Sequence, residues 1–293
     1  MTDSHPTALL SSAANVAVTR IVRDRLDAAL AAAERLADAV DPDALHDFRV
    51  ALRRLRSALR AYRPWLGRAA SRKLRSALRD LSRATNRGRD AEVQADWLES
   101  QERDLPDDAR AGTAKLVARL RKHRTLPARE LQAEFRITAD KISNRLEFQD
   151  GVSAGFAAVY EVLLAQHAAD AAACLATVTN ADQVEEAHEA RIAVKRLRYL
   201  LEPLAEEIRQ APPLLERVKQ LQDLLGELHD SHVLDDTLAD AAAARRLSRR
   251  AYAALAAENA KRRAAVFANL EQRWLGGAAT SFFEQIRRLA ARA

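Results

Sequence analysis

The sequence predicts an all-α protein made of two similar halves. Its 293 residues include only 8 Gly and 8 Pro, while Ala, Leu, Arg and Glu, all good helix formers, are abundant. No stretch is rich in Val, Ile and Thr at the period of two that marks a half-buried strand. A third observation, an internal repeat described below, indicates that the helices form two related units.

Chain length agrees with two such units. At ~150 residues per domain, the chain corresponds to about two domains, and it is long enough to bury a core. The best candidate boundary is Gln149-Asp150-Gly151, where one helical pattern ends and an Ala-rich one begins at Val152. We therefore expect the repeats to occupy residues 1–149 and 150–293.

The first predicted helix covers residues 7–40 and is rich in alanine. Its apolar side consists of Val18, Ile21, Val22, Leu26, Leu30 and Leu36. Asp41 then suits the N-cap of a second helix and Pro42 suits its first helical position. That second helix is expected to end near Pro64 and Gly67.

The second helix, at residues 46–63, has two different faces. At ~100° per residue, an arc of roughly 100° contains His46, Arg49, Arg53, Arg56, Arg60 and Arg63. An apolar face with alternating spacings of three and four contains Leu45, Phe48, Leu52, Leu55, Leu59 and Tyr62. This spacing is typical of a helix packed into a bundle. A cationic stripe beside a packed seam indicates an anion-binding site.

A third helix, residues 68–86, repeats this design and is expected to end at Gly88. One face carries Arg68, Arg72, Arg75, Arg79 and Arg83, and another carries Leu74, Leu78 and Leu81. Further helices are predicted over residues 90–101, 107–124 and 128–147, with Pro106 and Pro127 between them. A shorter basic row there consists of Lys115, Arg119 and Lys122.

The internal repeat is the most specific feature of the chain. The segment from His188 to Arg198 aligns without a gap with His46 to Arg56, at an offset of 142. A second pairing matches Asp90-Ala-Glu-Val93 with Asp230-Ser-His-Val233, at an offset of 140. Duplicated bundles tend to pack about a pseudo-two-fold axis, so we expect the two His/Arg helices to line a shared groove or pore.

Positive charge is concentrated in the first repeat. The net charge is +6, but residues 46–89 contain fourteen Lys or Arg against only Asp47 and Asp80, so the rest of the chain is net negative. Such a patch attracts polyanions and costs folding stability through self-repulsion. Residues 188–229 contain seven basic and seven acidic residues, and Glu202 stands where Arg60 stands. We therefore expect the first repeat to dominate anion binding.

Compartment and membrane signals are few. The single cysteine, Cys174, cannot form an internal disulfide and matches no thiolate metal motif, which fits a reducing cytoplasmic setting. No export signal is visible, and charged residues interrupt every apolar stretch that could span a bilayer. We expect a cytoplasmic protein that does not enter the membrane.

The repeated motifs resemble the CHAD family, the conserved histidine α-helical domain. Both His-x-x-Arg segments carry the resemblance, together with the element Leu225-Gly226-x-x-His229-Asp230-x-x-Val233. The first-half copy departs from it, with Thr85-Asn86 at the Leu-Gly pair. The resemblance covers nearly the whole chain and implies two four-helix bundles about a pseudo-two-fold axis. It also implies non-catalytic binding of inorganic polyphosphate, association with polyphosphate granules and no cofactor. The E-x-E-x-K strand of a fused CYTH-type triphosphatase is missing, so the chain resembles a stand-alone binding module.

The predicted phosphate contacts are mainly arginines, because a guanidinium makes two charge-assisted hydrogen bonds to phosphate and keeps its proton. The primary clamps are Arg49, Arg53, Arg56 and Arg60, with Arg75, Arg79, Arg83, Lys115, Arg119 and Lys122 as the opposite wall. The second-half equivalents are Arg191, Lys195, Arg198 and Lys219. His46 and His188 either donate to phosphate or pack at a helix start. A histidine beside phosphate would raise affinity as pH falls through ~6.5.

Two enzyme alternatives involve metals. Asp43-x-x-His46 and Glu185-x-x-His188 imitate the carboxylate–histidine pairs of di-iron bundles. His-Asp pairs resembling those of helical metal-dependent phosphohydrolases occur at His46-Asp47 and His229-Asp230, the latter with His232 and Asp236 nearby. Arginines occupy the next helical turn after each carboxylate–histidine pair, and a di-iron site would need two more carboxylates. We expect no catalytic residue and no metal ligand.

Two alternatives within the binding class stay open. Nucleic-acid phosphates would satisfy the same arginines, although aromatics make up only 5% of the chain and single-strand binders usually stack bases on them. Acidic surfaces outside the basic region could instead dock partner proteins. Chain-length preference and oligomeric state do not follow from the sequence.

Overall fold

A computed structural model of the chain confirms the all-α prediction. It describes residues 8–38, 41, 43–101, 103, 105, 107–122, 127–146, 154–205 and 207–290. The main helices are α1 (Ala14–Arg35), α2 (Ala44–Ala61), α3 (Arg72–Gln101), α4 (Asp107–Leu120), α5 (Ala128–Ser143), α6 (Phe156–Ala176), α7 (Val184–Leu201), α8 (Ala211–Ala243), α9 (Arg249–Trp274) and α10 (Gly277–Ala290). Within these residues the only extended pairing is an isolated bridge between Ala13 and Gly155.

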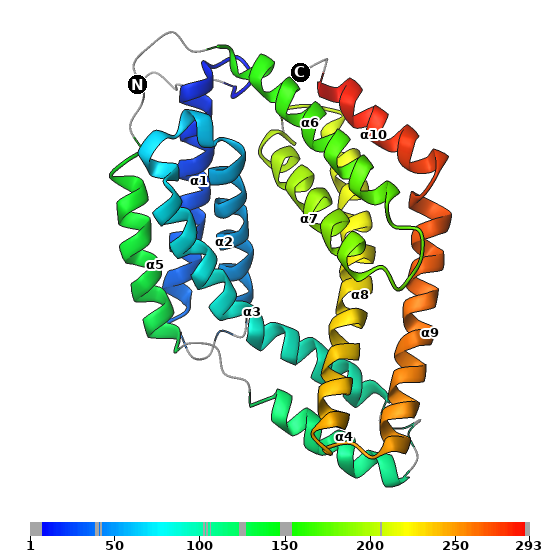
Figure 1. The fold of residues 1–293 in the computed structure, drawn as a ribbon. Coiled ribbons are helices and arrows are strands. Elements are labelled where there is room, and N and C mark those ends of the chain that lie inside the picture. The colour runs from blue at the N-terminus through cyan, green and yellow to red at the C-terminus, as the bar shows by residue number, and fades with distance from the viewer. Residues whose placement is uncertain are drawn as a thin grey trace.

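The helices form two groups that meet through α3 and α4 at one end of the molecule and through α1 and α6 at the other (Figure 1). On one side α1, α2, α5 and the first part of α3 lie together, and on the other side α6, α7, α10 and parts of α8 and α9 lie together. The second part of α3 leaves its group and reaches α4, which packs against both α3 and α9. The basic helix α2 faces α7 across the centre, and these two helices are in contact.

The apolar seam predicted for α2 is buried. Phe48, Leu52, Leu55 and Leu59 have no exposed surface, and the Phe48 ring meets the edge of Phe135 on α5 at 5.1 Å between centroids. Each such side chain contributes about 1.5–3 kcal/mol through removal of apolar surface from water. Burial of this seam fixes the rotation of α2, so its arginine face points away from α1 and α5.

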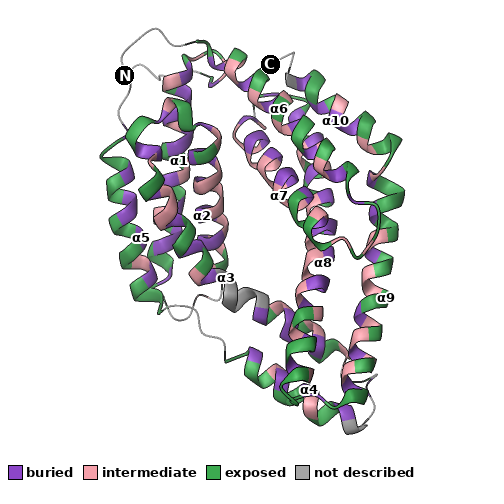
Figure 2. Ribbon diagram, in the orientation of Figure 1, coloured by how far each residue is buried: buried purple, intermediate pink, exposed green. Residues whose placement is uncertain are grey.

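In the described part of the chain, the buried residues, purple in Figure 2, form two hydrophobic clusters. The larger cluster contains residues from both halves of the chain, from Leu9 to Leu289. The smaller one joins the second parts of α3 and α8 to α4 and to the start of α9, and includes Leu98, Leu238 and Leu255. Both clusters therefore draw on residues before and after the predicted boundary at 149–150, which stays a prediction.

The order of elements repeats along the chain. In each half a long helix is followed by a basic helix that ends in a 3₁₀ turn, Arg63–Trp65 after α2 and Glu202–Leu204 after α7. A longer helix comes next in both halves, α3 and then α8. This order agrees with the aligned sequence motifs, and the pseudo-two-fold relation between the halves stays a prediction.

Three local predictions were wrong. The first helix, predicted over residues 7–40, covers only Ala14–Arg35. Gly88 does not end the third helix, because α3 continues to Gln101; glycine in a helix interior costs only about 1 kcal/mol and creates no clash. Asp41 is not the N-cap of α2, because this helix begins at Ala44 after Asp43. The Asp41 carboxylate instead accepts a hydrogen bond from the Asp43 N–H at 3.0 Å. The predictions for Pro42 and for residues 149–152 lie outside the described residues.

No helix within the described part of the chain combines the length and the apolar character needed to cross a bilayer.

Candidate anion-binding groove

A groove of about 580 Å³ lies between α2, α3 and α7. Eight of its lining side chains are cationic: Arg53, Arg56, Arg60, Arg72, Arg75, Arg79, Lys195 and Arg196. Serine hydroxyls and Tyr199 complete the polar lining, and none of the described lining residues is a carboxylate. The described lining therefore holds closely spaced positive charges with no acidic side chain among them, and outside the lining Asp80 lies 3.9 Å from Arg79.

Helical spacing places these cations on one surface. Arg53, Arg56 and Arg60 lie three and four residues apart on α2, beside the buried leucine seam. Arg72, Arg75 and Arg79 follow the same spacing on α3. Because α2 and α3 are in contact, their two arginine rows become the neighbouring walls of the groove.

Electrostatic repulsion within the groove is visible in the pKa values of its arginines. Burial lowers the pKa of Arg56, and Arg79 and Arg60 lower it further. Burial also lowers the pKa of Arg60, followed by the effect of Arg196. A bound anion would relieve this repulsion, because it supplies the counter-charge that the groove lacks.

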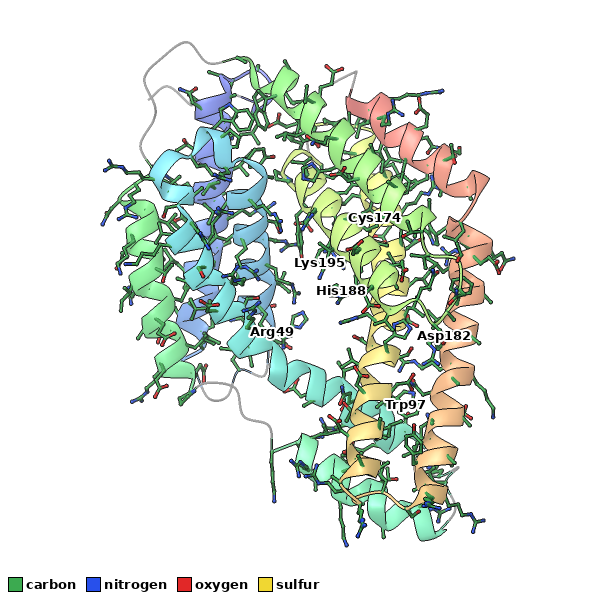
Figure 3. The ribbon with its side chains drawn as sticks, viewed as in Figure 1. Arg49, Trp97, Cys174, Asp182, His188 and Lys195 are labelled. Atoms are coloured by element: carbon green, nitrogen blue, oxygen red, sulfur yellow. The ribbon has the colours of Figure 1, made fainter. Side chains whose placement is uncertain are left out.

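Lys195 brings the second half of the chain into the groove. It extends from α7 into the space that faces α2 (Figure 3). Burial lowers its pKa to about 7, and the neighbouring cations Arg191, Arg53 and Arg56 act in the same direction. At neutral pH this side chain is therefore divided between its charged and neutral forms.

The two repeated motifs meet at a pair of histidines. The rings of His188 on α7 and His229 on α8 lie 5.1 Å apart between centroids, tilted by 44°. Burial, with help from Arg191, lowers the pKa of His229 to about 4, so its ring is neutral at pH 7. Burial and Arg191 also lower the pKa of His188. The rise in polyanion affinity expected from protonation of His188 therefore occurs at a pH below ~6.5.

Gly226 of the Leu-Gly pair lies beneath Arg191. A Cβ atom at this position would be 3.8 Å from Nε of Arg191, an ordinary van der Waals distance. A larger branched side chain would compete with the guanidinium for that space. Gly226 therefore lies next to the guanidinium of Arg191, with room for a Cβ atom between them.

Glu202 has a role that the charge comparison of the two repeats missed. Its carboxylate accepts hydrogen bonds from Arg54 at 2.7 Å and from Arg198 at 3.1 Å, and Arg25 lies 4.0 Å away. The Glu202 side chain is only 9% exposed. This acid therefore connects α1, α2 and α7. It also forms an ion pair with Arg198, which was predicted to bind phosphate.

Other predicted site residues lie outside the groove lining. Lys115, Arg119 and Lys122 are exposed on or just after α4, which packs on α3 and α9. Lys219 is exposed on α8 and lies 3.9 Å from Glu216. On α2, His46 is exposed and Arg49 is buried. Arg83 is exposed on α3, but it lies close enough to Arg56 to lower the pKa of Arg56.

The groove also contains cations that the predicted set omitted. Arg72 belongs to the arginine face of the third helix, and Arg196 follows Lys195 directly. Helical spacing could have found Arg72. No signal in the sequence identifies Arg196, because its position depends on how α7 packs against α2.

Within the described part of the chain, no three or more His, Cys, Asp and Glu side chains are grouped so that they could hold a metal ion.

A comparison with protein families places the chain. The model of the CHAD domain matches residues 20–239. The chain belongs to the CHAD domain family. The match includes α2, α3 and α7, and therefore all the helices that line the groove.

Solved structures agree with this assignment. The crystal structure of the CHAD domain from the plant Ricinus communis is 21% identical, with a TM-score of 0.60 over 97% of this chain and 93% of that one. PptA from Streptomyces chartreusis is 20% identical, with a TM-score of 0.67 over 94% of this chain and 100% of that one. At these identities the likeness concerns the fold. No curated protein matches the sequence.

Proposed function

We propose that this CHAD-domain chain binds inorganic polyphosphate in the groove between α2, α3 and α7, and that it does so without catalysis. The observation that carries the proposal is the composition of the groove. Among the described residues, eight cationic side chains and no carboxylate line about 580 Å³. A neutral or cationic ligand would leave this repulsion in place, whereas a polyanion would neutralise it.

The geometry suits a chain of repeated phosphates. Residues three and four apart on a helix advance about 5–6 Å along its axis, so a flexible polyphosphate laid along α2 and α3 meets a cation at each step. Seven of the eight lining cations are arginines. Their planar groups make paired hydrogen bonds to phosphate oxygens and retain their charge at every physiological pH.

Nucleic acid is the competing polyanion. Tyr199 is the one aromatic residue in the described lining of the groove, whereas proteins that hold single strands usually stack several bases on aromatic rings. The groove therefore favours a ligand with phosphates and no bases. Competition tests this directly: excess single-stranded or duplex DNA, at equal phosphate concentration, should leave long-chain polyphosphate bound. Displacement by DNA would refute the proposal.

A matched pair of variants tests the location. Arg56→Ala removes a cation from the groove, and Lys115→Ala removes one on α4, outside it. Each lost phosphate contact should lower the slope of log affinity against log salt by about 1. We expect this change, with weaker binding, in Arg56→Ala only. Equal effects of the two substitutions would place the ligand elsewhere.

We also propose that the chain acts in the cytoplasm at polyphosphate granules, as the family resemblance implies. A fluorescent fusion should then coincide with granules in a bacterium that accumulates polyphosphate. The same fusion with Arg53, Arg56 and Arg60 changed to alanine should spread through the cell. If that variant still localises to granules, localisation does not depend on the cations of the groove.

A further inference from the structure

Lys195 differs chemically from the other cations of the groove. It is the one lysine among the described residues that line the groove. The arginines keep their protons in proteins and so cannot act as nucleophiles at neutral pH. A lysine that loses its proton has a free electron pair on Nζ. Lys195 therefore gives the groove one amine that can react with an electrophile.

The charges around Lys195 favour the neutral amine. From α7 and α2, the strongest charged influences on it are Arg191, Arg53 and Arg56, and burial acts in the same direction to bring its pKa to about 7. At pH 7.5 most of such an amine is neutral, compared with about one in a thousand for an ordinary lysine.

The elements packed opposite Lys195 do not restore a counter-charge. On α8, the pKa of His229 is lowered to about 4, so this ring is neutral at pH 7. On α3, the charged residues that line the groove are all arginines, Arg72, Arg75 and Arg79. The amine therefore stands in a cavity that attracts anions, and this combination selects an electrophile that carries a phosphate.

We propose that Lys195 is an acylation site for acyl phosphates, whose phosphate end is held by the arginines of the groove. The modified side chain would lose its charge and weaken the groove for polyanions. This last consequence rests on the proposed function, whereas the acylation itself does not.

The reaction is balanced without any oxidant or reductant. Nζ of Lys195 attacks the carbonyl carbon of the acyl phosphate and forms the C–N bond of an amide. The bond from that carbon to the phosphate oxygen breaks, and inorganic phosphate leaves with the electron pair. The proton of the amine passes to the departing phosphate. Arginines that hold this phosphate also stabilise the charge that develops on it.

Acetyl phosphate and the full-length chain provide the test. The acetylation rate of each lysine is followed by mass spectrometry near neutral pH. Lys141 on α5 and Lys261 on α9 are the references, because both are exposed and neither lines the groove. At acetyl phosphate concentrations well below saturation of the groove, where the pKa of the free chain applies, we expect Lys195 to react at least about tenfold faster than either, because of its larger neutral fraction. An equal or lower rate at Lys195 would overturn the proposal.

Inorganic pyrophosphate tests the part played by the arginines. It carries no acyl group and competes for the same cations, so it should slow acetylation of Lys195 and leave Lys141 and Lys261 unaffected. If Lys195 reacts at the same rate with pyrophosphate present, the arginines do not hold the acyl phosphate and the proposal fails.

Long-chain polyphosphate separates this inference from the proposed function. If both are correct, polyphosphate protects Lys195, and the acetylated chain binds polyphosphate several-fold more weakly. Selective acetylation without polyphosphate binding would refute the proposed function and support the acylation site. Polyphosphate binding without selective acetylation would refute the acylation site and leave the proposed function standing.

Discussion

Polyphosphate binding should depend on pH through Lys195. In the free chain the pKa of this lysine is about 7, because burial and the nearby Arg191 and Arg53 disfavour its charged form. A bound polyanion supplies counter-charge and moves the pKa back towards the ordinary lysine value of about 10.4. Between these two values, binding takes up one proton. The affinity should therefore fall about tenfold per pH unit above pH 7.

The sign and the range follow from the groups that face Lys195. Deprotonation of Lys195 weakens polyphosphate binding as pH rises, and the surrounding arginines do not titrate in this range. The pKa of His229 is lowered to about 4 and that of His188 is also lowered, so both rings are mainly neutral at pH 7 and above. Their protonation strengthens anion binding only at lower pH.

Calorimetry in buffers of different ionisation enthalpy measures both the affinity and the number of protons taken up. The Lys195→Arg variant keeps a cation that does not titrate, so its affinity should stay level from about pH 7 to 9. Lys141→Met, on α5 and away from the groove, should retain the wild-type slope. The same slope in Lys195→Arg and wild type would show that another group, or the ligand itself, takes up the proton.

Three predictions concern stability and can be measured by chemical denaturation. Glu202→Gln should destabilise the fold by about 1–3 kcal/mol, because Arg54 and Arg198 lose a nearly buried carboxylate; no loss would show that these pairs contribute nothing. Leu55→Ala should cost about 2–5 kcal/mol, because this side chain is fully buried, and a change below 1 kcal/mol would contradict the packing of α2. Lys195→Met should stabilise the fold near pH 7 by about 3–5 kcal/mol, because the folded state disfavours the ammonium and the unfolded state does not. This gain should disappear as pH rises towards the unfolded pKa, and a gain that persisted there would assign the effect to packing alone.

Much of the fold could be predicted from the residues alone. Apolar side chains at spacings of three and four predicted the buried seam of α2, and Phe48 and Leu52 are indeed fully buried. This works because helical geometry is local, so residue spacing determines which side chains share a face. The end of the third helix was predicted less well, because Gly88 lowers helix stability without preventing helix formation.

The candidate site, like the fold, could be predicted only in part. Sequence spacing placed Arg53, Arg56 and Arg60 on one face of α2, and the groove is lined by all three. The row that begins at Lys115 has an equally regular spacing, yet it lies on α4, outside the groove. Periodicity defines a face of a helix, but it does not say what that face meets.

The sequence by itself therefore determined the helical class, the family motifs and the concentration of arginine in the first half. The repeat led us to expect that Lys195 would share a groove with the arginines of the other half, but only the tertiary structure decided how far this lysine is buried among them, and that Glu202 would join Arg54 to Arg198. The physical reason is that charge–charge interaction and burial depend on distances between helices far apart in the chain. Those distances are set by the packing of α2 against α7, which no local pattern encodes.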